Sequence, residues 1–507
     1  MRIKKIFAAF MAIALGVTSF AACGGGTELT SEEQEKSWHS LESGETVFIT
    51  FAGRDVATEQ ANYQQFITDF NDTHDNIVVD LQWWTDTSAY NIALDGMGTN
   101  LPDVFMLNNA MFPTYAGGGK LAAIGDYLDE SIFENLYETG YEVYYFDHTT
   151  KKVGYSEAAE LYGLPKDQGP IALTINEELL ESAVTAYNKT ASEADKVDLD
   201  RILSTTNPLR FSEFLEIGNK LKTVLSSSQY VCAGVDMQSI VYSNNTNYFT
   251  DDTGSTANID DENFIAAMQF VQDLYKDGIL PAAGTNSSAE QLFTTGNAIF
   301  YYAGPWKTKD YWQMCTSFTW NILPVLRGDA EGAVSMAYMG GMCYAISKNC
   351  KYKDAALELV KYLAADTASQ RTQYKRGQCI PNLKSLASEY AADTYGFIAN
   401  ESNQATPTPT NRSVWIDVVD GIGQEKTDAN GNTYTDVITG RYRAESYTFS
   451  ETWYSNLGSF MGGSTGSFGS FWKENNGEWV DIGAALKEYK ELMQGDLDDA
   501  RSLADRF

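Results

Sequence analysis

The sequence predicts an α/β protein of two domains, each built on a mainly parallel sheet flanked by helices. Its 507 residues are enough for two hydrophobic cores. A hydrophobic content of 43% is typical of a globular chain. Short apolar runs also alternate with segments of three-and-four apolar spacing, the pattern of strands joined by crossover helices.

The N-terminus has the anatomy of a secretory signal peptide over residues 1–22. Arg2, Lys4 and Lys5 precede an uncharged apolar run that is short for a membrane-spanning helix. The run ends in "FAAC", followed by three glycines, and resembles a bacterial lipobox in which Cys23 carries the lipid, palmitate included. Ordinary cleavage after Ala22 is the alternative. We expect residues 23–43 to form a polar tether to the extracytoplasmic face of the cell membrane, with no other membrane contact.

Charge and cysteine content exclude several classes of function. The net charge of −32 disfavours nucleic acid and anionic lipid surfaces as partners. The five cysteines beyond Cys23 show no CxxC spacing, so they predict neither a disulfide framework nor a metal site. Whether Cys343 pairs with Cys350 stays open. The three histidines fit no HExxH motif, and we expect no metal or cofactor.

Polar and aromatic side chains follow three predicted strands in the first part of the chain. The strands cover residues 46–53, 76–84 and 102–109, and a helix between the first two buries Tyr63, Phe66, Ile67 and Phe70. Ligands of parallel sheets bind beyond the carboxyl ends of the strands. The residues at those ends form the predicted site: Arg54, Asp55, Trp83, Trp84, Asn108 and Asn109.

The second part contains a further set of strands and helices. Strands are expected at 171–175, 297–303, 319–326 and 339–348, and helices at 177–183, 211–225, 262–278, 353–365 and 479–494. The strand "NAIFYYA" stops at Gly304 and Pro305 and presents Trp306, either as a core residue or as the floor of a site. Residues 392–476 are rich in Gly, Ser and aromatic residues and look like an elaboration that shapes the site.

Several stretches, in this order, resemble extracellular solute-binding proteins of ATP-driven sugar importers (family 1, carbohydrate type, similar to maltose-binding proteins). They cover residues 47–386 and read "LPDVFMLNNAMFPTYAGGGKLAAI", "YGLPKDQGPIALTINEELL", "FVQDLYKDGILP", "LFTTGNAIFYYAGPW", "GGMCYAISKNCKYKDAALELVKYL" and "GQCIPN". Each stretch alone is partly common to α/β proteins in general, so the resemblance to this family depends on all of them occurring in this order.

The resemblance implies a two-lobe periplasmic-binding-protein-like fold of type II with discontinuous lobes. Lobe I would comprise residues 44–168 and 345–390, and lobe II residues 169–344 and 391–507. Hinge crossings would fall at Gly169, Pro170, Gly340 and Gly341, and the lobes would close on the ligand. The implied function is capture of a sugar, an oligosaccharide in the leading interpretation, by a monomer that delivers it to an ABC transporter permease without any catalytic step.

The resemblance also implies aromatic contacts with the sugar. Trp306 occupies the "GPW" turn whose Trp stacks on a sugar ring in the family, and Tyr248 lies in a similar "NYFT" stretch. Trp415 matches a third stacking position loosely, with ordinary helix packing as the alternative. Asn108 and Asn109 stand where relatives place an acid, so amides would bind the hydroxyls. The alternative for Arg54 and Asp55 is a surface ion pair.

Other functions remain as alternatives. A binding protein for a polyol, a glycerophosphodiester or a peptide needs only a different site, whereas a secreted glycoside hydrolase needs a pair of carboxylates for which no motif stands out. Residues 428–436, "DANGNTYTD", resemble part of a calcium loop, but Thr433 and Thr439 replace its Gly and Glu. An Asn-Gly turn in a β-hairpin explains that stretch more simply.

Overall fold

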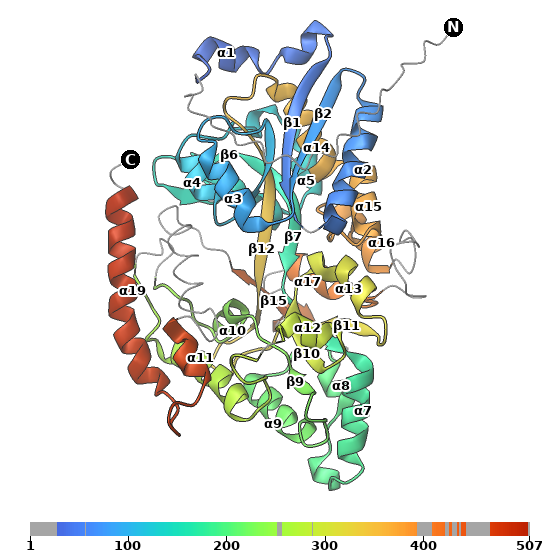
Figure 1. The fold of residues 1–507 in the computed structure, drawn as a ribbon, viewed down its shortest axis with the longest axis vertical. Helices are drawn as coiled ribbons and strands as arrows, with labels where there is room; N and C mark the ends of the chain where they lie inside the picture. Colours follow the sequence, from blue (N-terminus) through green and yellow to red (C-terminus); the bar gives the residue numbers. More distant parts are fainter. Residues whose placement is uncertain are drawn as a thin grey trace.

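The chain folds into two lobes stacked along its long axis, each with its own sheet (Figure 1). One core cluster fills the first lobe and extends to residues of the second such as Tyr311 and Trp320, and another lies mainly within the second lobe. The structure is a computed structural model that describes residues 28–55, 57–250, 256–285, 287–392, 408–420, 425–427, 433–435, 438–442 and 467–504. The predicted signal peptide and Cys23 lie outside the described residues.

The sheet of the first lobe has the strand order β15-β12-β3-β1-β2, with β7 also paired to β12. Its parallel centre consists of β1 (Val47–Arg54), β2 (Ile77–Trp84) and β3 (Val104–Asn108). The long strand β12 (Ser335–Ile346) runs antiparallel to both β3 and β7 (Gly163–Pro170), and parallel to β15 (Ile438–Tyr442). The bounds of β1, β2, β3 and β12 agree with the predicted strands to within a few residues at each end, whereas β7 and β15 are not among the predicted strands.

Amphipathic helices cover the faces of this sheet. The helix α2 (Ala57–Thr73) buries Tyr63, Phe66, Ile67 and Phe70, as the apolar spacing predicts. In Figure 1 it lies beside α14 (Lys353–Ala365) and α15 (Thr367–Lys375), while α3 (Thr87–Gly96) and α4 (Phe112–Gly117) lie on the opposite side. Smaller elements complete the lobe: α5 (Glu130–Asn135), α6 (Glu138–Tyr141), β4 (Tyr145–Asp147), β5 (Lys152–Val153), β6 (Glu160–Leu161) and α16 (Ala387–Ala392).

The sheet of the second lobe has the order β11-β8-β10-β9 and is mixed rather than mainly parallel. The strand β8 (Ala172–Asn176) is antiparallel to β10 (Ala298–Ala303) and β11 (Trp320–Leu323), and only β9 (Tyr230–Cys232) runs parallel to β10. The reason is topological, because β8 enters this lobe from β7 and runs away from the first lobe. The strand β10 runs back, so its end points at the junction of the lobes.

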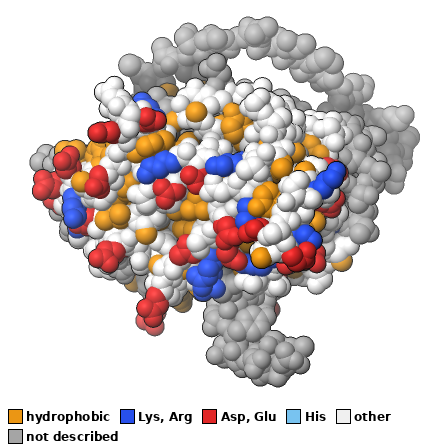
Figure 2. All heavy atoms as spheres, turned by 90° about the horizontal axis from the view of Figure 1, so that it is seen from below, with side chains coloured by type: hydrophobic (Ala, Val, Ile, Leu, Met, Phe, Trp, Pro, Cys, Tyr) orange, Lys and Arg blue, Asp and Glu red, His pale blue; other side chains and the backbone are white. Residues whose placement is uncertain are grey.

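Helices surround this second sheet. They include α7 (Glu177–Asn188), α9 (Phe211–Leu221), α10 (Met237–Ser243), α11 (Glu262–Lys276), α12 (Ala289–Thr294), α13 (Thr308–Met314), α17 (Ser413–Asp420) and the C-terminal α19 (Ile482–Ala504). Seen from below, the face of this lobe carries acidic and basic side chains interspersed with apolar ones (Figure 2). Among the described side chains of that view, neither sign of charge dominates, so this face offers no large single-charge field.

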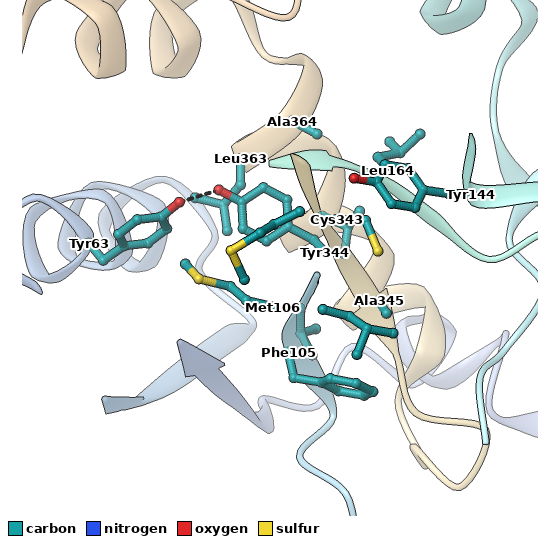
Figure 3. Close-up of a cluster of buried hydrophobic side chains, with 14 of the residues drawn as sticks. Tyr63, Phe105, Met106, Tyr144, Leu164, Cys343, Tyr344, Ala345, Leu363 and Ala364 are labelled. Carbon is teal, nitrogen blue, oxygen red and sulfur yellow. Dashed lines mark hydrogen bonds between the residues drawn. The ribbon is translucent and has the colours of Figure 1, made fainter. Parts of the chain in front are cut away.

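Two strands cross between the lobes and pair with each other. β7 and β12 are hydrogen-bonded from Gly163 opposite Ala345 to Pro170 opposite Met339. Inside the first lobe they run through a dense core where the hydroxyls of Tyr63 and Tyr344 meet (Figure 3). The crossing is therefore continuous with the core rather than a separate linker.

The part of residues 392–476 that the structure describes contains three short strands. β13 (Glu425–Thr427) pairs antiparallel with β14 (Thr433–Thr435), as the predicted Asn-Gly hairpin requires. The intervening turn, with most of the proposed calcium loop, lies outside the described residues. The strand β15 adds to the edge of β12.

The described residues show whether their cysteines form disulfides and whether their helices could span a membrane. Their five cysteines, Cys343 and Cys350 included, form no disulfide with one another and are all buried. Within the same residues, none of the helices combines the length and the apolar character needed to cross a bilayer.

The N-terminal segment differs from the expected tether, because residues 28–43 pack onto the first lobe. They form α1 (Ser31–Lys36) and the 3-10 turn η1 (Ser40–Ser43). The Trp38 ring stacks on Tyr127 with 3.8 Å between centroids, and Lys353 Nζ donates to Gln34 Oε1 (2.6 Å) and Ser37 Oγ (2.7 Å). Burial lowers the pKa of Lys353 to about 8.

We expect Lys353→Met to release this segment. Met keeps the apolar stem but leaves the oxygens of Gln34 and Ser37 without their donor, at a cost of roughly 1–3 kcal/mol in the free energy of unfolding. Hydrogen exchange should accelerate across residues 30–43, and denaturant unfolding should measure the loss. Lys351→Met, at an exposed neighbouring lysine, is the control and should change neither. Unchanged exchange in Lys353→Met would contradict the role of Lys353 as the anchor.

Candidate functional site

The ends of β1 and β2 bring four of the predicted residues together. The parallel register sets Gly53 opposite Trp83 and Arg54 opposite Trp84. Beyond the strand, Asp55 N donates to Trp84 O (3.1 Å), and Trp83 Nε1 donates to Asp55 O (3.0 Å). The backbone of Asp55 is therefore held in place by β2, at the carboxyl edge of the sheet.

The two tryptophans at this edge are both partly buried. The Trp83 ring lies against Gly53, where a Cβ would come within 2.5 Å of ring carbon Cζ3, and it packs on Tyr63 with 5.1 Å between centroids. The Trp84 ring meets Tyr90 edge-on at 5.4 Å. Glycine at position 53 is thus required for Trp83 to lie flat on the sheet.

Arg54 carries a polar atom that suits a ligand. Its Nη1 donates to Thr87 Oγ1 (2.8 Å), which fixes the guanidinium near the start of α3. Its Nε is buried and has no hydrogen-bond partner among the described residues. A buried donor of this kind is costly unless something accepts from it.

Asn108 and Asn109 lie at the end of β3, next to the crossing strand. Asn108 Oδ1 accepts from Met111 N (2.8 Å), and Asn109 N donates to Gly341 O (3.1 Å). The β3 end is therefore tied to the predicted hinge, in which Gly340 pairs with Gly169 and Met339 with Pro170.

Trp306 reaches this junction from the second lobe. It follows β10 in the short turn η5 (Pro305–Lys307), and its ring lies on a bed of two glycines. A Cβ at Gly304 would come within 1.9 Å of the ring carbon Cζ3, and one at Gly169 within 2.8 Å of the same atom. The side chain is still 38% exposed. One face of the ring is thus packed on backbone while the residue keeps open surface.

Tyr248 and Trp415 do not join this group. Tyr248 is 0% exposed in the second core, edge-on to Tyr242 and Phe264. Trp415, on α17, is 1% exposed and belongs to the core cluster that extends from the first lobe to Tyr311 and Trp320 of the second. Neither ring has a face that a ligand can reach in this structure, so both predictions are corrected: these two rings serve packing.

A buried polar network that the sequence did not indicate adjoins the site. Lys166 Nζ contacts Glu59 Oε1 (2.8 Å) and Asp167 Oδ2 (2.8 Å). Gln378 Nε2 donates to the same Glu59 oxygen, and Asn62 Nδ2 donates to Gln378 Oε1 (2.7 Å). Lys309 Nζ of the second lobe donates to Asn62 Oδ1 (3.0 Å). The network therefore joins α2, the crossing strand β7 and the second lobe.

Burial governs the titration of this network. It raises the pKa of Glu59 to about 8, against the opposing effect of Lys166, and Asp55 raises it further. Lys166 stays charged because Asp167 and Glu59 hold its pKa above the usual range in spite of its burial. No local motif marks these residues, since they are scattered from position 59 to position 378.

A cavity of about 700 Å³ lies elsewhere, between α1 and the segment β4–β6. Its lining includes Trp38, Tyr127, His148 and Tyr162, and none of the predicted site residues. It adjoins Leu121 and Ala122, which contact the Ile346–Ser347 end of β12. The cavity is thus at the opposite end of the sheet from Asn108, and we do not place the site there.

Comparison with known proteins identifies relatives of this chain. A galactooligosaccharide-binding protein of Bacillus subtilis is 28% identical over 162 residues, which is 31% of this chain and 38% of that protein. Solved structures that share the fold include the following two. One is an ABC substrate-binding protein of Listeria monocytogenes in complex with cycloalternan (TM-score 0.66, 14% identity, 90% of this chain and 100% of that one). The other is the sugar-binding protein MalE of Xanthomonas citri (TM-score 0.61, 16% identity, 91% and 100%).

These structural likenesses show a two-lobe α/β fold, in agreement with the two sheets and the paired crossing strands described above. The profile of the bacterial extracellular solute-binding proteins matches residues 55–370, which is more than half of the chain. That match begins directly after β1 and includes the ends of β2 and β3, the crossing strands and the Trp306 turn. The chain belongs to the family of bacterial extracellular solute-binding proteins.

Proposed function

We propose that this protein captures a sugar, an oligosaccharide in particular, between its two lobes and delivers it to the permease of an ABC transporter. The observation that carries the proposal is the Trp306 ring. It is held on the backbone of Gly304 and Gly169 with open surface, where the second lobe meets the crossing strands. A flat aromatic surface beside polar groups complements a sugar, whose C–H face is apolar and whose rim is hydroxylated.

The polar groups for the hydroxyls come from the first lobe. Arg54 and Asp55 would bind at the end of β1, Asn108 and Asn109 at the end of β3, and Trp83 and Trp84 would supply further ring surface at the end of β2. The buried Nε of Arg54 gains an acceptor in this arrangement. No covalent step, metal or cofactor is needed, so the protein acts as a carrier and not as an enzyme.

Closure would bend the chain at Gly169, Pro170, Gly340 and Gly341, with lobe boundaries near residues 168, 344 and 390. A pair of hydrogen-bonded crossing strands suits a hinge, since a few residues can absorb the rotation while both lobes stay rigid. Closure brings Trp306 from one lobe toward the loops of the other.

The relatives support a sugar as the ligand class. The Bacillus subtilis protein is described as binding galactooligosaccharides, and the Listeria monocytogenes protein was solved with cycloalternan. We also propose that Cys23 carries the lipid anchor after removal of residues 1–22. The protein would then act as a monomer on the extracytoplasmic face of the membrane. The alternative is that the ligand is a polyol, a glycerophosphodiester or a peptide.

Trp306→Ala should abolish binding while leaving the fold intact. The test is a thermal-shift screen of residues 24–507 against mono-, di- and oligosaccharides, because a ligand that binds only the folded state raises Tm. We expect a shift for an oligosaccharide in the wild type, its loss in Trp306→Ala and its partial recovery in Trp306→Phe. Trp479→Ala, at a partly buried tryptophan in the second lobe, is the matched control and should keep the shift.

Two outcomes would count against the proposal. A shift that survives Trp306→Ala would return Trp306 to a purely structural role. A folded wild type that responds to none of the sugars, but does respond to peptides or glycerophosphodiesters, would replace the ligand class.

Gly304→Ala should weaken binding without removing any ligand contact. The added Cβ overlaps the Trp306 ring, so the ring must leave its place, at a cost of about 1–3 kcal/mol in stability. We expect a higher Kd in fluorescence titrations and an altered Trp emission spectrum. Gly96→Ala, where a Cβ meets nothing within 4 Å, is the control and should bind like the wild type. Equal affinities for the two variants would show that the glycine bed does not position the ring.

A further inference from the structure

The cavity of about 700 Å³ beside the N-terminal segment plays no part in the proposed sugar site. Its volume lies within the range of roughly 300–1,000 Å³ that is common for small-molecule sites. One wall is formed by Gln34 and Trp38 of the segment 28–43, and other walls come from residues 119–127, β4 and β6. In Figure 1, α1 lies at the end of the first lobe that is farthest from the second. The docked segment therefore completes a cavity that lies wholly within the first lobe.

Aromatic side chains supply much of the apolar lining of this cavity. The Trp38 ring is stacked on Tyr127, which keeps 44% of its surface exposed, and both residues line the cavity. Phe133 from α5 and Tyr145 from β4 are partly buried and line it as well. Aromatic surface of this kind packs against the apolar C–H face of a sugar ring.

The formal charges among the described residues that line the cavity cancel. Asp126 and Glu160 are acidic, and Lys348 and Lys353 are basic. A ligand with a single charge would meet two groups of its own sign, whichever sign it carried. A hydroxyl group, in contrast, can donate to a carboxylate and can also accept from an ammonium group. The balance of charge therefore favours a neutral ligand that is rich in hydroxyl groups.

Three of these charged groups have hydrogen-bonding capacity to spare. Within the part of the chain that the structure describes, the exposed side chains of Asp126 and Lys348 have no hydrogen-bond or ion-pair partner. Glu160 uses one of its two carboxylate oxygens, Oε2. Lys353 differs, because its three protons already go to oxygens of the N-terminal segment and of Cys350. The rim thus offers both acceptors and a donor.

Glu160 is held in place by a buried neighbour. Tyr162, which is 5% exposed, donates to Glu160 Oε2 (2.6 Å), so the tyrosine oxygen is left to accept from His148 Nε2 (2.8 Å). Burial and the Glu160 carboxylate raise the pKa of Tyr162, which therefore keeps the proton of this bond. The remaining oxygen, Glu160 Oε1, is a fixed acceptor at the edge of the cavity.

We propose that this cavity is a second carbohydrate site, which binds a neutral sugar independently of the site between the lobes. Tyr127, Phe133 and Tyr145 contact the apolar faces of the sugar. Asp126, Glu160 and Lys348 bind its hydroxyls. All of the lining belongs to the first lobe and its docked N-terminal segment, so binding here needs no closure. A glycan held at this site stays bound while the two lobes open and close.

The test follows both sites in one experiment. Residues 24–507 are labelled with 5-fluorotryptophan, and the fluorine signals of Trp38 and Trp306 are assigned with Trp38→Phe and Trp306→Phe. Trp38 reports on the cavity and Trp306 on the site between the lobes. The probes are maltotriose, galactotriose and mannotriose, with trigalacturonic acid as the charged comparison.

A pair of neighbouring alanines supplies the blocking variant and its matched control. Ala159 lines the cavity, so Ala159→Phe fills part of it without removing a polar contact. Ala158 is exposed and does not line it, so Ala158→Phe adds the same ring outside the cavity. We expect at least one neutral trisaccharide to shift the Trp38 signal in the wild type and in Ala158→Phe, and this shift to be lost in Ala159→Phe. Trigalacturonic acid should leave the Trp38 signal unchanged.

The two signals separate the failure of this proposal from that of the proposed function. A Trp38 signal that no neutral sugar shifts, that shifts equally in Ala159→Phe, or that only trigalacturonic acid shifts overturns the second site. If Trp306 responds in any of these cases, the site between the lobes still stands. A shift of Trp38 that is lost in Ala159→Phe, with an unresponsive Trp306, supports the second site and counts against the proposed function.

Discussion

The antiparallel pairing of β7 with β12 is the interaction on which both lobes depend. Each strand starts in one lobe and ends in the other, and their ladder runs from the core around Tyr344 to Met339 at the edge of the second lobe. β3 pairs with β12, and β8 continues from β7, so the direction of nearly every strand near the junction is set by this one ladder. The ends of β1, β2 and β3 face the end of β10 because the ladder fixes their polarity.

The second constraint is the close packing of tryptophan rings on glycine backbone. Trp306 lies on Gly304 and Gly169, and Trp83 lies on Gly53, in each case closer than any Cβ would allow. A ring that rests on backbone is held by surface contact over its whole face and loses few rotamer states when a ligand arrives. This explains why glycine occurs at the end of a strand and in a crossing strand, although β-branched residues have the higher propensity for strands.

The sequence was informative wherever the signal is local. Apolar spacing located α2 and the strands around it, and the positions after strand ends located Arg54, Trp83 and Asn108 at one edge of the sheet. It was uninformative about burial and long-range contact. Tyr248 and Trp415 are aromatic residues in stretches that resemble those of the family, as Trp306 is, but only tertiary packing decides which ring is enclosed. The Glu59 network joins residues more than 300 positions apart, and the mixed second sheet depends on strand directions that periodicity does not encode.

The docking of residues 28–43 determines how the molecule would transmit motion. Lys353 and Asp354 bind this segment to the first lobe, so a load applied at the N-terminus is carried by that lobe and bypasses the crossing strands. In the closure proposed above, the second lobe would then swing about a stationary first lobe. The work of closure would go into a single moving body, and a restraint on this segment would exert no torque on the proposed hinge.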